Sequence, residues 1–202
     1  MGLLDILNIL KGKSKTKLHE LKWKLPEGRF IAQIADASHA IKALKKLGLH
    51  FMSGGEFVDS VYFKEFGEGV YAYYIIRTDK RTESERLIFE GYMLEEEEKL
   101  GVEIESSFLM MNNLKKMGYK QAFVRDLTLW SFVFGALQVN IYSIVGLGDF
   151  LEVCIPKTKF VKAREAMEKH AFHLFERLKI KKEEVMPADV LTLQLMTVTE
   201  KQ

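Results

Sequence analysis

The order of apolar and polar positions along the chain predicts a protein built mainly of β-strands, with a few helices between them. Stretches rich in β-branched and aromatic residues are separated by glycines and polar turns, as in antiparallel sheets. The predicted strands cover residues 29–35, 57–66, 70–77, 86–93, 102–105, 119–134, 137–145 and 150–155. Elsewhere apolar residues recur every three or four positions, which is the period of an amphipathic helix. The predicted helices cover residues 39–47, 107–117 and 159–179, and a short helix follows Pro187.

One short sequence occurs twice and predicts an internal repeat. Its copies are Leu44-Lys45-Lys46-Leu47-Gly48 and Leu114-Lys115-Lys116-Met117-Gly118. A capping residue precedes each helix, Asp36 or Ser38 in the first copy and Ser106 or Ser107 in the second, and a glycine ends it. Self-similar segments usually pack as equivalent parts of one body. We therefore expect one domain, residues 25–202, with two similar halves at about 25–94 and 99–202.

The number and grouping of the strands predict the fold class. About eight strands fall into two antiparallel groups, with too few crossover helices for a parallel α/β sheet. The class that fits is α+β, an antiparallel eight-stranded β-barrel or tunnel, closed or nearly closed, with helices packed outside. A barrel of this size leaves a lumen wide enough for side chains or one small ligand. The side chains that alternate into this lumen then decide the function.

Composition restricts the functional classes. Hydrophobic residues make up 48% of the 202 residues and charged residues 29%, as in an ordinary globular protein. The net charge of +2 argues against a nucleic-acid partner. The one cysteine, Cys154, lies in an apolar run, so we expect no internal disulfide, a small buried thiol and a reducing, cytoplasmic location. We expect no transmembrane helix, because no apolar run approaches the roughly 20 residues that one needs.

The N-terminal residues 1–24 have a character of their own. An apolar stretch at residues 3–10 is followed by alternating lysines, so the segment is amphipathic and basic. Such a segment packs on its own domain, on a second copy of the chain in a homodimer, on another protein or on an anionic membrane surface. The sequence leaves these partners open. It lacks the basic start and the small-residue cleavage site of a secretory signal.

A second motif points to a family. The run Val145-Gly146-Leu147-Gly148-Asp149-Phe150-Leu151-Glu152, together with the Lys-Lys-Met-Gly helix end, resembles the CYTH family of triphosphate tunnel proteins, which includes class IV adenylate cyclases and thiamine and inorganic triphosphatases. The order of elements agrees from about Glu27 to Met196. The resemblance implies a tunnel in which inward arginines and lysines hold a triphosphate. It also implies inward carboxylates that bind Mg²⁺ or Mn²⁺, the hard cations that oxygen ligands prefer.

The resemblance assigns site residues one by one. It implies phosphate-binding roles for Arg77 and Arg125, to which we add Arg29 as a further candidate cation, although the family has a glutamate at that position. It implies metal-binding roles for Glu27, Glu103, Glu105 and Glu152, and it names no catalytic residue. Other positions of the family pattern carry different residue types here: Arg29, Ile31, Ile75, Glu90, Leu127, Tyr142 and Cys154. An alternative without any ligand is that Arg77, Arg125 and Glu152 pair with one another inside the barrel.

These replacements lead to three functional hypotheses. The first is a divergent CYTH-like protein that binds a phosphorylated or other anionic ligand with weak or no catalysis, because a phosphoryl-transfer site depends on positioned charge. The second is an active metal-dependent triphosphatase or class IV-type adenylate cyclase whose clamp is rebuilt from residues such as Arg29, Arg86 or Lys120. The third is a scaffold or membrane-surface protein that acts through residues 1–24. The sequence leaves enzymatic activity open.

Overall fold

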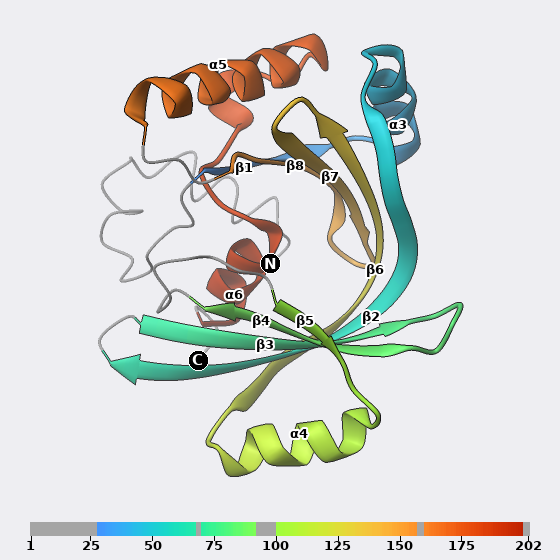
Figure 1. Ribbon diagram of the computed structural model, residues 1–202, viewed down its shortest axis with the longest axis vertical. Coiled ribbons are helices and arrows are strands. Elements are labelled where there is room, and N and C mark those ends of the chain that lie inside the picture. The colour runs from blue at the N-terminus through green and yellow to red at the C-terminus, as the bar shows by residue number, and fades with distance from the viewer. Residues whose placement is uncertain (1–27, 68–69, 92–99, 157–159, 200–202) are drawn as a thin grey trace. The chain divides into compact units, whose positions relative to one another are not determined.

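The computed structural model describes residues 28–67, 70–91, 100–156 and 160–199 (Figure 1). Every predicted strand and helix is present, with ends that differ by a few residues, except that β2 begins well before Phe57. The strands are β1 Arg29–Ile34, β2 His50–Gly67, β3 Val70–Asp79, β4 Glu85–Gly91, β5 Leu100–Glu103, β6 Lys120–Phe134, β7 Leu137–Ile144 and β8 Gly148–Cys154. The helices are α3 Ala37–Lys46, α4 Ser107–Lys116, α5 Val161–Arg177, the 3₁₀ helix η1 Lys182–Glu184 and α6 Val190–Thr199.

The strands form one eight-stranded sheet in the order β1-β8-β7-β6-β2-β3-β4-β5. The prediction of an α+β protein with eight antiparallel strands and helices outside is confirmed. The order ends in β1 and β5, so among the described residues the sheet is open, and the closure into a barrel that we expected from the sequence is not found there. No described helix combines the length and apolar character that a membrane crossing requires.

The chain divides into two compact units. The described part of unit 1 lies in Phe57–Asp126 and in the end of α6, and the described part of unit 2 lies in Leu25–Glu56 and Leu127–Gln194. Strands β2 and β6 each contribute one part to either unit. The units are therefore different from the sequence halves 25–94 and 99–202, because each unit combines segments from both. Residues 1–24 lie outside the described part of the chain.

The predicted repeat is visible at the ends of two helices, α3 in unit 2 and α4 in unit 1. Gly48 follows α3 with a φ angle of +83°, and Gly118 follows α4 with a φ of +85°. This left-handed conformation is the usual way to end a helix, and glycine adopts it without the strain of a side chain. The backbone N–H of the next residue then returns to the helix, from Leu49 to the Leu44 carbonyl and from Tyr119 to the Leu114 carbonyl.

The starts of the two helices also match. Asp36 caps α3 by accepting from the backbone N–H of His39, and Ser106 caps α4 by accepting from that of Leu109. A carboxylate from a neighbouring strand binds the first N–H of each helix. Asp149 of β8 accepts from Ala37 at 2.7 Å, and Glu85 of β4 accepts from Ser107 at 2.6 Å. The acidic residue of the Gly-Leu-Gly-Asp motif thus stabilises the start of a helix.

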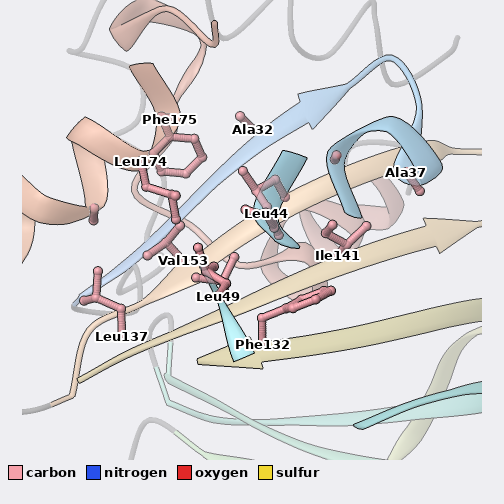
Figure 2. Close-up of a cluster of buried hydrophobic side chains, with 14 of the residues drawn as sticks. Ala32, Ala37, Leu44, Leu49, Phe132, Leu137, Ile141, Val153, Leu174 and Phe175 are labelled. Atoms are coloured by element: carbon pink, nitrogen blue, oxygen red, sulfur yellow. The ribbon is translucent and has the colours of Figure 1, made fainter. Parts of the chain in front are cut away.

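Helices α3 and α5 in unit 2, and α4 in unit 1, each pack on one face of the sheet, which we call the outer face. In unit 2, side chains of α3, α5 and four strands form a buried core around Leu44, Ile141, Val153 and Phe175 (Figure 2). In unit 1, Leu114 of α4 packs with Tyr62, Ile76 and Tyr119. Because side chains alternate along a strand, the residues between these core positions lie on the opposite, inner face. The inner faces carry two clusters of buried charged residues.

Candidate functional site

Two arginines and one aspartate meet on the inner face of unit 1. Arg77 of β3 donates from Nε to Asp59 Oδ1 at 2.7 Å and from Nη2 to Oδ2 at 2.8 Å. Arg125 of β6 donates from Nε and Nη2 to Asp59 Oδ2, at 3.1 and 2.9 Å. Asp59 of β2 stands opposite Arg77 in the strand register, which brings the pair together. One carboxylate thus holds two guanidinium groups, and we call these three residues the Asp59 cluster.

The Asp59 cluster is deeply buried. The side chain of Asp59 is 0% exposed, that of Arg125 is 5% exposed and that of Arg77 is 17% exposed. Burial opposes the ionisation of Asp59, but the hydrogen bonds and charges of Arg77 and Arg125 outweigh it and hold the pKa of this carboxyl below its ordinary value. The Arg77 guanidinium also lies 4.9 Å from the centre of the Phe57 ring, a cation–π contact that fixes its orientation further.

The other predicted residues of unit 1 lie outside this cluster. Glu103 of β5 pairs with Arg86 of β4 at 3.4 Å, and its side chain is 77% exposed. Glu105 follows β5 and is exposed. Ile75 is buried beside Arg77 on β3, and Glu90 stands opposite Tyr73 in the register of β3 and β4. The structure therefore brings together the two predicted phosphate ligands of this unit, but it leaves both predicted metal ligands at the surface.

A second charged cluster lies on the inner face of unit 2. Arg29 Nη1 on β1 is 3.4 Å from Glu152 Oε1 on β8 and 3.3 Å from Asp189 Oδ2, just before α6. The antiparallel pairing of β1 with β8 places Ile31 opposite Glu152 and brings the side chain of Arg29 into reach. Asp189 arrives there because two backbone hydrogen bonds join Ile31 to Met186. We call Arg29, Glu152 and Asp189 the Arg29 cluster.

The Arg29 cluster continues into a polar network. The thiol of Cys154 donates to Glu152 Oε1 at 3.1 Å, and Asn140 Nδ2 lies 3.9 Å from the Cys154 sulfur. Asn140 Oδ1 accepts from Ser131 at 2.8 Å. Cys154, which we expected to be a small buried hydrophobic residue, is instead half-buried and hydrogen-bonded. Glu152 is 1% exposed, and its Oε2 has no hydrogen-bond partner within the part of the chain that the structure describes.

The sequence missed the two aspartates that organise these clusters. It grouped Arg77, Arg125 and Glu152 as possible partners of one another, whereas the arginines pair with Asp59 and the glutamate pairs with Arg29. Asp59 had a signal, since it is the one charged residue in the otherwise mostly apolar run of residues 57–63. Asp189 had one too, because it is the capping residue before an apolar helix. Glu27 lies outside the described residues, so its predicted metal role stays a prediction.

Solved structures of other proteins share this fold. The PH1012 protein from Pyrococcus horikoshii matches with a TM-score of 0.65 and 18% identity over 82% of this chain and 97% of that one. A conserved hypothetical protein from Pyrococcus furiosus matches with a TM-score of 0.64 and 21% identity over 82% and 98%. A protein described as a putative adenylate cyclase from Vibrio parahaemolyticus matches with a TM-score of 0.63 and 12% identity over 82% and 95%.

These likenesses define the chain by its fold. The fold expected from the sequence is thus shared with these proteins, one of which is described as a putative adenylate cyclase. No protein-family model matches the chain. No curated protein matches it either.

Proposed function

We propose that this chain is a divergent member of the CYTH family that binds a phosphorylated or other anionic ligand, with weak or no catalysis. The fold, shared with a protein described as a putative adenylate cyclase, supports the family. The observation that carries the ligand class is the Asp59 cluster, in which Arg77 and Arg125 converge on one carboxylate oxygen at 2.8 and 2.9 Å. Two guanidinium groups held at one point favour an oxyanion, because their planar donors match its oxygens.

The same cluster argues against efficient triphosphate chemistry. A metal–triphosphate complex needs several cations and a set of carboxylates, and phosphoryl transfer depends on both. Here Asp59 already accepts hydrogen bonds from both arginines. In addition, Ile75 and Leu127 occupy positions where the resemblance implies cations. Each charge-assisted hydrogen bond that is lost removes about 1.5–3 kcal/mol of binding free energy. A ligand with a single phosphate or carboxylate group therefore suits the arginines better than a triphosphate does.

A thermal-shift experiment tests this proposal, because any ligand that binds the folded state raises the melting temperature. Phosphate, pyrophosphate, tripolyphosphate and ATP are each added with and without Mg²⁺ or Mn²⁺. We expect at least one anion to raise the melting temperature without any divalent metal. The Arg77→Gln variant should lose this response. The matched control is Arg86→Gln, which removes an exposed arginine opposite Arg77 on the next strand.

Two results would contradict the proposal. If no anion changes the melting temperature, or if Arg77→Gln responds as strongly as the wild type, the Asp59 cluster binds no anion. If tripolyphosphate or ATP is turned over with Mg²⁺ or Mn²⁺ and Glu152→Gln abolishes the turnover, the chain is the active triphosphatase or cyclase of the second hypothesis.

A further inference from the structure

The metal site that the CYTH resemblance implies does not fit the residues that the structure places. Glu103 is exposed and paired with Arg86, and Glu105 is exposed. Glu152 is buried in the other unit, where an arginine already faces it. Among the described residues, no group of three or more histidine, cysteine, aspartate or glutamate side chains could hold a metal ion. In unit 2 the mismatch has a physical cause, the Arg29 cluster.

We propose that Arg29 takes the place of a divalent cation on the inner face of unit 2, so that the carboxylates there are neutralised by the chain itself. A single nitrogen, Nη1, lies within ion-pair distance of both Glu152 and Asp189. Both carboxylates are buried, with side chains 1% and 7% exposed, and a buried carboxylate needs a counter-charge. The Arg29 guanidinium provides that charge at 12% exposure, and it is not lost by deprotonation at any ordinary pH.

Most carboxylate oxygens of Glu152 and Asp189 already accept hydrogen bonds, so few are available to bind a metal ion. Asp189 uses Oδ2 for Arg29 and Oδ1 for the N–H of Thr192, the hydrogen bond that starts α6. Glu152 Oε1 accepts from both Arg29 and the Cys154 thiol. Only Glu152 Oε2 is open among these four oxygens. Mg²⁺ requires close to octahedral oxygen coordination at about 2.0–2.1 Å, and one open oxygen does not provide it without displacing Arg29 or the helix cap.

The arrangement also has a structural role. Two backbone hydrogen bonds join Met186 to Ile31 of β1, and Asp189 lies three residues after Met186. The ion pair of Asp189 with Arg29 therefore fixes the start of α6 to β1 as well. The charge of Arg29 thereby holds the C-terminal segment on β1. We predicted Arg29 as a phosphate ligand, whereas its geometry assigns it to the chain's own carboxylates. The inference uses the proposed CYTH membership only to choose Mg²⁺ and Mn²⁺ as test metals.

The test compares the metal response of three forms of the full chain by thermal unfolding and by titration calorimetry with Mn²⁺. The wild type should show no saturable Mn²⁺ binding and the same melting temperature in EDTA, Mg²⁺ and Mn²⁺. Arg29→Gln should melt several degrees lower in EDTA and regain part of the loss with Mn²⁺, because two carboxylates have lost their cation. The control Arg164→Gln, which removes an ion pair with Glu168 on α5, should show neither effect.

Each other outcome overturns the inference. Saturable Mn²⁺ binding that raises the wild-type melting temperature means that Arg29 does not take the metal's place. Arg29→Gln with the stability of the wild type, or with a loss that Mn²⁺ leaves unchanged, means that the carboxylates need no cation. If Arg29→Gln fails to fold in EDTA, refolding with Mn²⁺ must restore its far-UV circular dichroism, and failure to do so also contradicts the inference. The anion response of Arg77 in unit 1 is measured separately, so either proposal can fail alone.

Discussion

Replacing Asp59 by asparagine perturbs the Asp59 cluster at its centre. The wild-type carboxylate accepts four hydrogen bonds from two guanidinium groups and is fully buried. Asparagine keeps one acceptor oxygen but no charge, so two buried cations face each other without their carboxylate. Removing one partner of a buried ion pair costs about 3–5 kcal/mol of unfolding free energy. For a chain of this length, that loss lowers the melting temperature by on the order of 10 °C.

The assay is thermal unfolding followed by circular dichroism at pH 7. Its matched control is Glu103→Gln, which removes a carboxylate from an arginine in the same unit, but at 77% exposure. An exposed ion pair contributes about 0–1 kcal/mol, so this variant should melt within a few degrees of the wild type.

Added phosphate provides the decisive comparison. If the arginines are as close as the geometry places them, an oxyanion should replace the missing carboxylate in Asp59→Asn. Phosphate should then raise the melting temperature of this variant more than that of the wild type. An Asp59→Asn protein as stable as the Glu103→Gln control would show that Asp59 is not the counter-charge of Arg77 and Arg125.

Three further predictions follow from described contacts. The folded-state pKa of Asp59 is lowered, so the wild type should lose stability below about pH 4, the unfolded-state pKa of an aspartate, as the pH falls toward that lowered value. In acid titrations of unfolding, Asp59→Asn should lose less stability over the same pH range. Gly48→Ala and Gly118→Ala should each lower the unfolding free energy by about 1 kcal/mol in urea, because both positions have positive φ; a loss at only one would show that the two helix ends are not equivalent. Asp149→Ala should cost about 1 kcal/mol by removing the hydrogen bond to the Ala37 N–H, and an unchanged urea midpoint would contradict that role.

Local patterns predicted most of the fold. The strands, the helix after Pro187 and the repeated helix ends are visible in the sequence because each depends on nearby residues, such as a capping aspartate or a glycine with positive φ. The start of β2 was missed because Gly54 and Gly55 look like a turn. A Cβ at Gly54 would lie 3.1 Å from the Leu129 carbonyl oxygen, so the glycine permits close strand contact rather than a turn.

The site was predictable only in part. The family resemblance singled out Arg77 and Arg125, and the structure places both in one cluster. It could not supply Asp59 or Asp189. The partners of Asp59 are 18 and 66 residues away in the sequence and depend on strand register, and Arg29 is 160 residues from Asp189 and depends on the path of the C-terminal segment. Closure of the sheet was also beyond the sequence, since strand patterns specify pairing but not which strands become edges.

The most direct test of the proposed function measures phosphate release from tripolyphosphate together with its binding. Calorimetry and a phosphate assay are run on the wild type and on Arg77→Gln, with and without Mg²⁺ or Mn²⁺. We expect anion binding that needs no divalent metal, that is lost in Arg77→Gln, and that leads to little or no phosphate release. Rapid release of phosphate that requires the metal and disappears in Glu152→Gln would contradict it.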